Sequence, residues 1–175
     1  MKIIEKIQEE SIWRIRRFAS EKDKKAKRVY SRDEALKLFG VEQISEFNGN
    51  LLLNEGINEL FTLICSATGT KFDNANAYLG VGDSATAEDA TQTGLLAATN
   101  FLYKVMEAGF PTYGTAQKAT WKSSFGSAEA NFAWNEFTVC NTGANTGKNL
   151  NRKVSAQGTK VSGQTWELNL EISLS

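Results

Sequence analysis

The 175-residue chain contains no histidine, only one proline and only two cysteines. The absence of histidine excludes the Ser-His-Asp and Cys-His catalytic arrangements, His-based zinc sites and a protonation switch near neutral pH. No apolar run approaches the ~18 residues that a membrane-spanning helix needs. The opening stretch, MKIIEKIQEESIW, carries acidic side chains and lacks an unbroken apolar core, so we expect neither a signal peptide nor association with a membrane.

The two cysteines give no indication of a disulfide. Cys65 falls in a predicted helix, and Cys140 falls at the end of a predicted strand. A disulfide between them would require an oxidising compartment, which nothing else in the sequence suggests. We therefore expect two buried free thiols.

The polar loops offer little support for catalysis or metal binding. Residues 143–149, GANTGKN, have one residue too few between the glycines for a phosphate loop, and we interpret them as a hairpin turn. Glu129 and Glu136 would lie about 23 Å apart on a regular strand, too far for a glycosidase pair. Four acidic loop residues lack the spacing of a calcium-binding loop: Asp73, Asp83, Glu88 and Asp89. We expect no enzymatic activity, no metal and no cofactor.

From about residue 70 onward, apolar residues recur with a period of two, which is typical of β-strands. The clearest strand has five apolar residues on one face: Trp166, Leu168, Leu170, Ile172 and Leu174. Shorter runs at 78–81, 101–106 and 119–125 are separated by loops rich in Gly, Asn, Thr and Ser. The sequence therefore predicts a mainly β fold over residues 48–175, an antiparallel β-sandwich of the jelly-roll-like type.

The most aromatic stretch of the chain, FGSAEANFAWNEFTVCN at 125–141, changes phase in its middle. Phe132 and Trp134 share one parity, whereas Phe137 and Val139 share the other. A β-bulge at residues 135–136 would bring both pairs to one core, and we favour this interpretation. Alternatively, the strand is central and covered on both faces, with Glu136 paired at one side.

Two helices have clear boundaries in the sequence. Residues 53–67 are expected to form a packed amphipathic helix with Asn54 as its N-cap. Its apolar face combines six residues: Leu53, Ile57, Leu60, Phe61, Ile64 and Cys65. A shorter helix, DEALKLF, follows a capping box formed by Ser31 and Glu34, and it ends at Gly40.

The N-terminal residues 1–47 are expected to form a basic helical arm, in which Ile3, Ile4 and Ile7 belong to a ragged apolar stripe. Residues 11–32 hold nine basic and two acidic side chains, a net charge of +7, although the whole chain is neutral. Eight of these basic residues are candidates for binding a partner: Arg14, Arg16, Arg17, Lys22, Lys24, Lys25, Lys27 and Arg28.

The basic arm has three interpretations. We favour docking on an acidic protein surface, with the arm ordering as it binds. A merely solvated helix is the second interpretation. Nucleic-acid binding is the third, and it is disfavoured because the arm has few aromatic side chains for stacking and the pI of the whole chain is only about 6.4.

Residues 47–175 resemble small virion structural proteins of tailed bacteriophages. The resemblance is carried by NLLLNEGINELFTLI, FDNANAYLGVGDS, TGLLAATNFLYKVMEAGFPT, FGSAEANFAWNEFTVCN and NLNRKV, in this order. It implies a head decoration or cement protein, in a virion assembled in the bacterial cytoplasm, that stabilises the capsid shell through its body and its arm. Expected partners are the major capsid protein, other virion proteins and copies of itself, with a trimer favoured. It implies no catalytic residues.

Two other functions stay open. A tail, baseplate or connector subunit of the same kind of virion fits the resemblance almost as well. A carbohydrate- or receptor-binding module is suggested by the aromatic residues and by the loops rich in Asn and Thr, because aromatic rings can stack on sugars.

Overall fold

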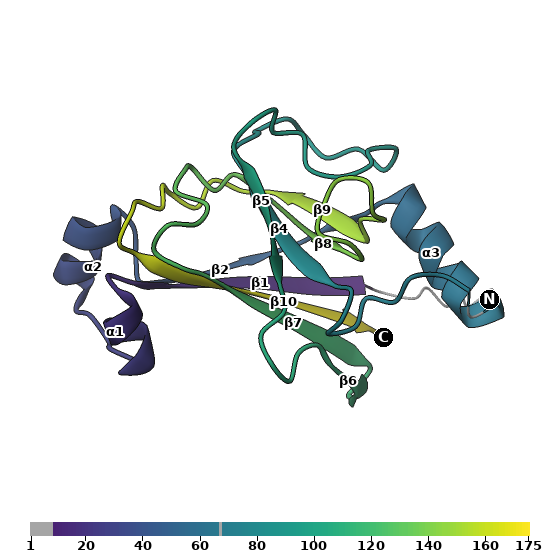
Figure 1. Cartoon of the computed structure of the whole chain (residues 1–175), viewed down its shortest axis with the longest axis horizontal. Helices are drawn as coiled ribbons and strands as arrows, with labels where there is room; N and C mark the ends of the chain where they lie inside the picture. The colour runs from purple at the N-terminus through teal and green to yellow at the C-terminus, as the bar shows by residue number, and fades with distance from the viewer. Residues whose placement is uncertain (1–8, 67) are drawn as a thin grey trace, which may run out of the picture.

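The computed structural model describes residues 9–66 and 68–175. Two five-stranded antiparallel sheets lie one over the other (Figure 1). The first sheet has the order β2 (Ile44–Asn48), β1 (Glu9–Phe18), β10 (Thr165–Leu174), β7 (Lys118–Phe125) and β6 (Thr112–Thr115). The second has the order β3 (Leu51–Leu52), β9 (Asn151–Val154), β8 (Glu136–Cys140), β4 (Tyr78–Gly82) and β5 (Phe101–Val105). The mainly β fold with two antiparallel sheets is as predicted, and it is consistent with a sandwich.

The core lies between the two sheets and is rich in tryptophan. Trp134, Trp166 and Phe125 are fully buried, and the ring centroids of Trp134 and Trp166 are 4.9 Å apart in an edge-to-face arrangement. Strand β10 alternates as predicted, because Trp166, Leu168 and Leu170 are fully buried on its inner face. Such aromatic pairs stabilise a core beyond the area that they bury.

The predicted helical arm is wrong for residues 9–18, which form β1, an interior strand of the first sheet. β1 pairs with β10 over its full length and with β2 on its other side. Ser11, Trp13, Ile15 and Arg17 are buried, so the residues alternate between an inner and an outer face. This segment is therefore built into the sandwich rather than appended to it. Residues 1–8, with the three isoleucines assigned to the arm, lie outside the described residues.

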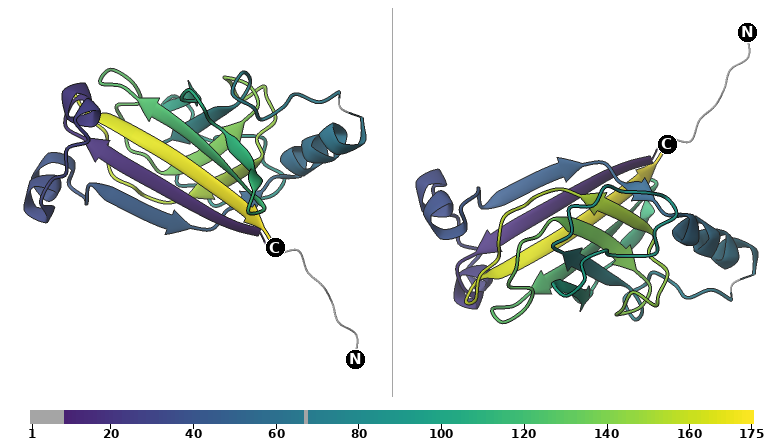
Figure 2. Two further views of the ribbon diagram at one scale, coloured as in Figure 1. Left: turned by 90° about the horizontal axis from the view of Figure 1, so that it is seen from below. Right: turned by 90° about the horizontal axis from the view of Figure 1, so that it is seen from above.

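Two short helices follow β1 at one end of the molecule (Figure 2). α1 (Glu21–Lys25) is capped by Ser20, and α2 (Arg32–Phe39) begins with the predicted capping box of Ser31 and Glu34. α2 ends as predicted at Gly40, whose φ of 71° is left-handed and therefore suits glycine. Helical structure in this region thus comprises residues 21–25 and 32–39 only.

α3 (Asn54–Cys65) lies at the other end of the molecule (Figure 2) and confirms the predicted helix. Its N-cap is Leu53 rather than Asn54, and no side chain caps it. The expected apolar face is confirmed at Leu53, which is buried, and at Leu60, which packs against the core, but it is wrong at three exposed residues: Phe61, Ile64 and Cys65. Buried Gly56 and half-buried Leu60 and Leu63 contact the rest of the molecule, because these residues are spaced by one helical turn.

The phase change in the aromatic stretch has a simple origin. β8 begins only at Glu136, and residues 126–135 before it form turns and a single bridge at Ala133. All five residues of β8 are buried, because the strand is central in its sheet and covered on both faces. The favoured bulge is therefore wrong, although its expected consequence is correct, because Trp134, Phe137 and Val139 share one core and Phe132 packs against it. The alternative is correct in that β8 is covered on both faces and Glu136 is paired.

Several smaller predictions also have an outcome. Residues 141–150 join the antiparallel strands β8 and β9, so the hairpin interpretation of residues 143–149 is confirmed. Both cysteines are free, but only Cys140 is buried and Cys65 is exposed. The expectation of two buried thiols was wrong for Cys65 because α3 turns that side of the helix to solvent.

Candidate interaction surfaces at the two ends of the sandwich

The eight predicted partner-binding residues do not form one surface. Arg14 lies on the outer face of β1, where its Nε donates a 2.9 Å hydrogen bond to Glu46 of β2. Arg28 pairs loosely with Asp23 and Glu34 at 3.6 Å. Lys22 is exposed on α1. These three residues are therefore solvent-facing, and two of them have local acidic partners.

Arg17 has a structural role. Its side chain is fully buried, and its guanidinium donates to the Glu42 carbonyl at 3.0 Å, the Ser45 hydroxyl at 2.7 Å and the Gln157 carbonyl at 2.7 Å. It also lies 4.6 Å from the ring centroid of Trp166. Burial lowers the pKa of Arg17 to about 10. Arg17 thus joins β1 to β2 and to the loop before β10, and it is not available to a partner.

The remaining four predicted residues meet in a cleft of about 420 Å³ between α1 and the outer face of the first sheet. We call it the basic cleft. It is lined by Arg16, Phe18, Glu21, Lys24, Lys25, Lys27, Glu107, Lys122 and Glu167. Sequence reasoning missed Lys122 and the two distal glutamates, because they come from β7, β10 and the loop after β5.

At the floor of the basic cleft, two lysines and two glutamates neutralise one another in ion pairs. Lys24 lies 2.9 Å from Glu107 and 3.8 Å from Glu167, and Lys122 lies 3.2 Å and 3.1 Å from the same two carboxylates. Burial would raise the pKa of Glu107, but hydrogen bonds from Lys24 and Lys122 outweigh it and hold this pKa below its usual value. Burial would lower the pKa of Lys122, and Glu167 and Glu107 outweigh that effect and raise it.

Three cations of the basic cleft stay without an acidic partner among the described residues: Arg16, Lys25 and Lys27. Arg16 lies 5.3 Å from the ring centroid of Phe18, and its Nε is buried without a hydrogen-bond partner. A buried donor without an acceptor costs free energy, so a ligand atom that accepts a hydrogen bond from this Nε would be stabilising.

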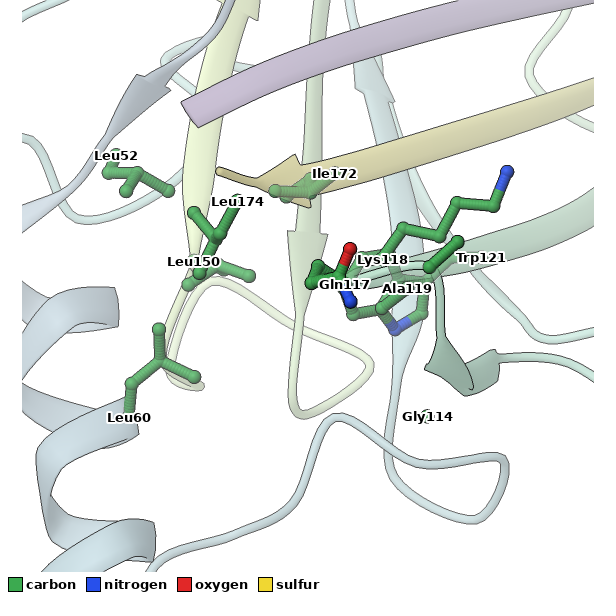
Figure 3. A pocket seen from close by; sticks show the side chains of 11 residues that line it. Leu52, Leu60, Gly114, Gln117, Lys118, Ala119, Trp121, Leu150, Ile172 and Leu174 are labelled. Atoms are coloured by element: carbon green, nitrogen blue, oxygen red, sulfur yellow. The ribbon is translucent and has the colours of Figure 1, made fainter. Parts of the chain in front are cut away.

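A second surface lies where the sandwich opens beside α3, and we call it the apolar groove (Figure 3). Its volume is about 520 Å³. The lining residues are Leu52, Leu60, Gly114, Ala116, Gln117, Lys118, Ala119, Trp121, Leu150, Ile172 and Leu174. The sequence did not predict this groove, because the residues come from separate strands, a turn and a helix that only the fold brings together.

Large exposed apolar side chains lie on the elements that border this groove. On α3, Phe61 is 61% exposed and Ile64 is 77% exposed. Tyr113 of β6 and Leu174 at the end of β10 are also exposed. Apolar side chains that gather in this way commonly mark an interaction surface, whereas isolated ones are normal.

The two surfaces lie at opposite ends of β1 and β10. Phe18 pairs with Thr165 beside the basic cleft, and Glu9 pairs with Leu174 beside the apolar groove. The two pairs are nine residue steps apart along β1, which corresponds to about 30 Å. The same two strands therefore carry a charged cleft at one end and an apolar groove at the other.

Comparisons with protein-family models, curated proteins and solved structures find no match for this chain. Among residues 9–66 and 68–175, no helix is both long and apolar enough to span a membrane. The same residues contain no group of three or more acidic or cysteine side chains arranged to hold a metal ion. Glu136 and Glu129 instead form separate ion pairs, with Arg152 and Lys104.

Proposed function

We propose that this protein is a structural component of a tailed-phage virion, and specifically a head decoration or cement protein. The supporting observation is the pair of chemically different contact surfaces, about 30 Å apart along the same two strands. A protein that stabilises a repeating shell needs one surface for the shell and another for neighbouring copies. A jelly-roll-like sandwich is the fold that we expect for such a role.

In this proposal the basic cleft contacts the major capsid protein or another virion protein. The apolar groove and the exposed face of α3 contact further copies of the chain, with a trimer as the expected assembly. A ridge formed by Phe61 and Ile64 lies next to a groove on the same chain, so a symmetry-related copy can offer a groove to each ridge. Several weak contacts of this kind, linked on one particle, raise the effective concentration at each site.

The decisive experiment locates the protein in intact particles by imaging at a resolution that distinguishes subunits. Many copies spread over the shell at symmetry-related positions are the expected result. A small ring at the neck, tail or baseplate would overturn the decoration role in favour of a tail or connector subunit. Absence of the protein from purified particles would overturn a structural role in the virion altogether.

A second measurement tests attachment through the basic cleft. Purified heads that carry either the wild-type chain or the variant Lys25→Gln/Lys27→Gln are washed at increasing salt. We expect the variant to leave the heads at lower salt, because opposite charges that attract at a surface are screened by salt. Deleting residues 1–30 would not be informative, because the deletion removes β1, an interior strand of the first sheet.

A further inference from the structure

We propose that the basic cleft is a carboxylate-binding site that accepts an acidic segment of a protein partner, with Arg16, Lys25 and Lys27 as the binding residues. This inference deepens the proposed function by naming the chemistry that the partner offers. It rests on the proposed function only in assigning the acidic segment to a virion protein. The binding chemistry itself follows from the cleft and can be tested on the isolated protein.

The first argument is the charge that the cleft leaves uncompensated. Lys24 and Lys122 each form ion pairs with both Glu107 and Glu167, and all four N···O distances are 3.8 Å or less. Glu21, the third carboxylate, accepts a hydrogen bond from Thr165 at 3.2 Å. The lining as a whole holds five cations and three carboxylates, so its net charge is +2. An anionic ligand would balance this charge without breaking an internal ion pair.

The second argument is the setting of Arg16. It lies on the outer face of β1, directly opposite Glu167 in the register with β10, yet no ion pair joins the two side chains. Its guanidinium lies over the buried ring of Phe18, and its Nε–H, which lies in the guanidinium plane, has no acceptor among the described residues. Such a fork matches the two oxygens of a carboxylate and binds them with two parallel hydrogen bonds.

A protein segment fits the cleft better than a nucleic acid. The net charge of the cleft lining is only +2, so it can balance one or two carboxylates but not the continuous chain of phosphates of a nucleic acid. The nearby aromatic side chains of Phe18 and Tyr30 are buried, at 1% and 7% exposure, so neither can stack on a base. The whole chain is also neutral, whereas proteins that bind nucleic acid through phosphates commonly carry excess positive charge.

The test measures binding of a fluorescently labelled hexaglutamate peptide to the full chain by fluorescence anisotropy at low and at moderate salt. Arg16→Gln and the triple variant Arg16→Gln/Lys25→Gln/Lys27→Gln are compared with the wild type. Arg14→Gln is the matched control, because Arg14 lies two residues away on the same face of β1 but outside the cleft. We expect each cleft variant to bind about tenfold more weakly or worse, and the control to bind like the wild type.

Three outcomes would overturn the proposal. One is that wild-type protein fails to bind the peptide at low salt. Another is that Arg14→Gln weakens binding as much as Arg16→Gln, which would indicate diffuse attraction rather than a site. The third is tighter, cleft-dependent binding of a labelled oligothymidylate of equal charge, which would identify a nucleic-acid site.

Thermal unfolding of each variant verifies that the fold is intact. Arg16→Lys, which keeps the charge but not the planar fork of donors, replaces Arg16→Gln in the binding assay if Arg16→Gln does not fold. The location of the protein in particles is measured separately, so failure of this inference and failure of the proposed function are distinguishable.

Discussion

Arg152 and Glu136 form an ion pair that is completely buried on the outer side of the second sheet. The Nη2 atom of Arg152 lies 2.7 Å from the Oε2 atom of Glu136, and neither side chain is exposed to solvent. Glu136 also accepts hydrogen bonds from the backbone N–H groups of Leu96 at 2.9 Å and Ala97 at 2.7 Å. The pair is therefore the anchor of the long connection at residues 83–100.

The other end of that connection is held by the same arginine. Nη1 of Arg152 donates to the carbonyl of Thr86 at 2.9 Å and to the side chain of Gln92 at 3.0 Å. Connections of this length without regular structure are uncommon in compact domains, because their backbone groups need partners. The buried pair supplies those partners, so the loop and the second sheet are expected to unfold together.

We predict that Glu136→Gln lowers the free energy of unfolding by about 3 kcal/mol or more, because it leaves the charge of Arg152 buried without its partner. Urea denaturation measures this change. The matched control is Glu46→Gln, which breaks the half-exposed pair with Arg14 and is expected to cost less than about 1 kcal/mol. Equal effects of the two variants would contradict the anchoring role.

Lys160 provides a prediction about pH. Its side chain is fully buried and donates to the Gly126 carbonyl at 2.7 Å and to Asn131 at 2.8 Å. Burial lowers the pKa of Lys160 from 10.5 to about 8. Between these two values the unfolded chain keeps the proton that the folded chain releases, so this residue makes the free energy of unfolding rise as pH increases.

Lys160→Met removes that contribution. The stability of the wild type relative to this variant is therefore expected to increase between pH 8 and pH 10, by on the order of 2 kcal/mol. Burial raises the pKa of both Tyr103 and Cys140, which opposes the trend, but these two residues are present in both proteins and cancel in the difference. Urea denaturation at a series of pH values measures it, and a difference that is flat with pH would contradict the prediction.

The sequence predicted β10 well and β1 poorly, for a physical reason. The inner face of β10 is entirely apolar along its buried part, so its period of two is unmistakable. The inner face of β1 includes Ser11 and Arg17, and three arginines within residues 14–17 hide the alternation. Arg17 is tolerated inside only because its acceptors, at Glu42, Ser45 and Gln157, arrive from distant parts of the chain. No local pattern contains that information.

The candidate surfaces also combine features that the local sequence predicts with features that depend on residues far apart in the chain. Local charge drew attention to four residues that the fold brings into the basic cleft: Arg16, Lys24, Lys25 and Lys27. Which of them are free could not be predicted, because Glu107 and Glu167 reach Lys24 only through the pairing of β10 with β7 and the folding of α1 over both. The helix at residues 54–65 was likewise predictable, but the side of it that packs depends on the close approach of another backbone.

That close approach gives a prediction for Gly56. A Cβ atom at this position would lie 2.6 Å from the carbonyl oxygen of Asn149 and closer still to the backbone of Leu150. In an open helix, Gly→Ala stabilises by about 1 kcal/mol. Here we expect Gly56→Ala to lower the free energy of unfolding by about 2 kcal/mol, because α3 must move away from the sandwich. Asn58→Ala, on the exposed side of α3, is the control and is expected to raise stability slightly; a stabilising Gly56→Ala would contradict the packing.

The exposed face of α3 gives the last prediction. A helix of 12 residues is marginal in water without packing, and α3 has no side-chain cap at its N-terminus. The double variant Phe61→Gln/Ile64→Gln removes the apolar ridge and introduces glutamine, which is a good helix former. If this ridge contacts a second copy, sedimentation velocity over a range of concentrations will show that the wild type associates and that the variant stays monomeric. We expect the free energy of unfolding of the variant to be unchanged. Val29→Gln, which changes a residue that is 76% exposed beyond α1, is the control and should associate like the wild type. A wild type that stays monomeric at every concentration, or a control that loses association equally, would exclude α3 as the contact between copies.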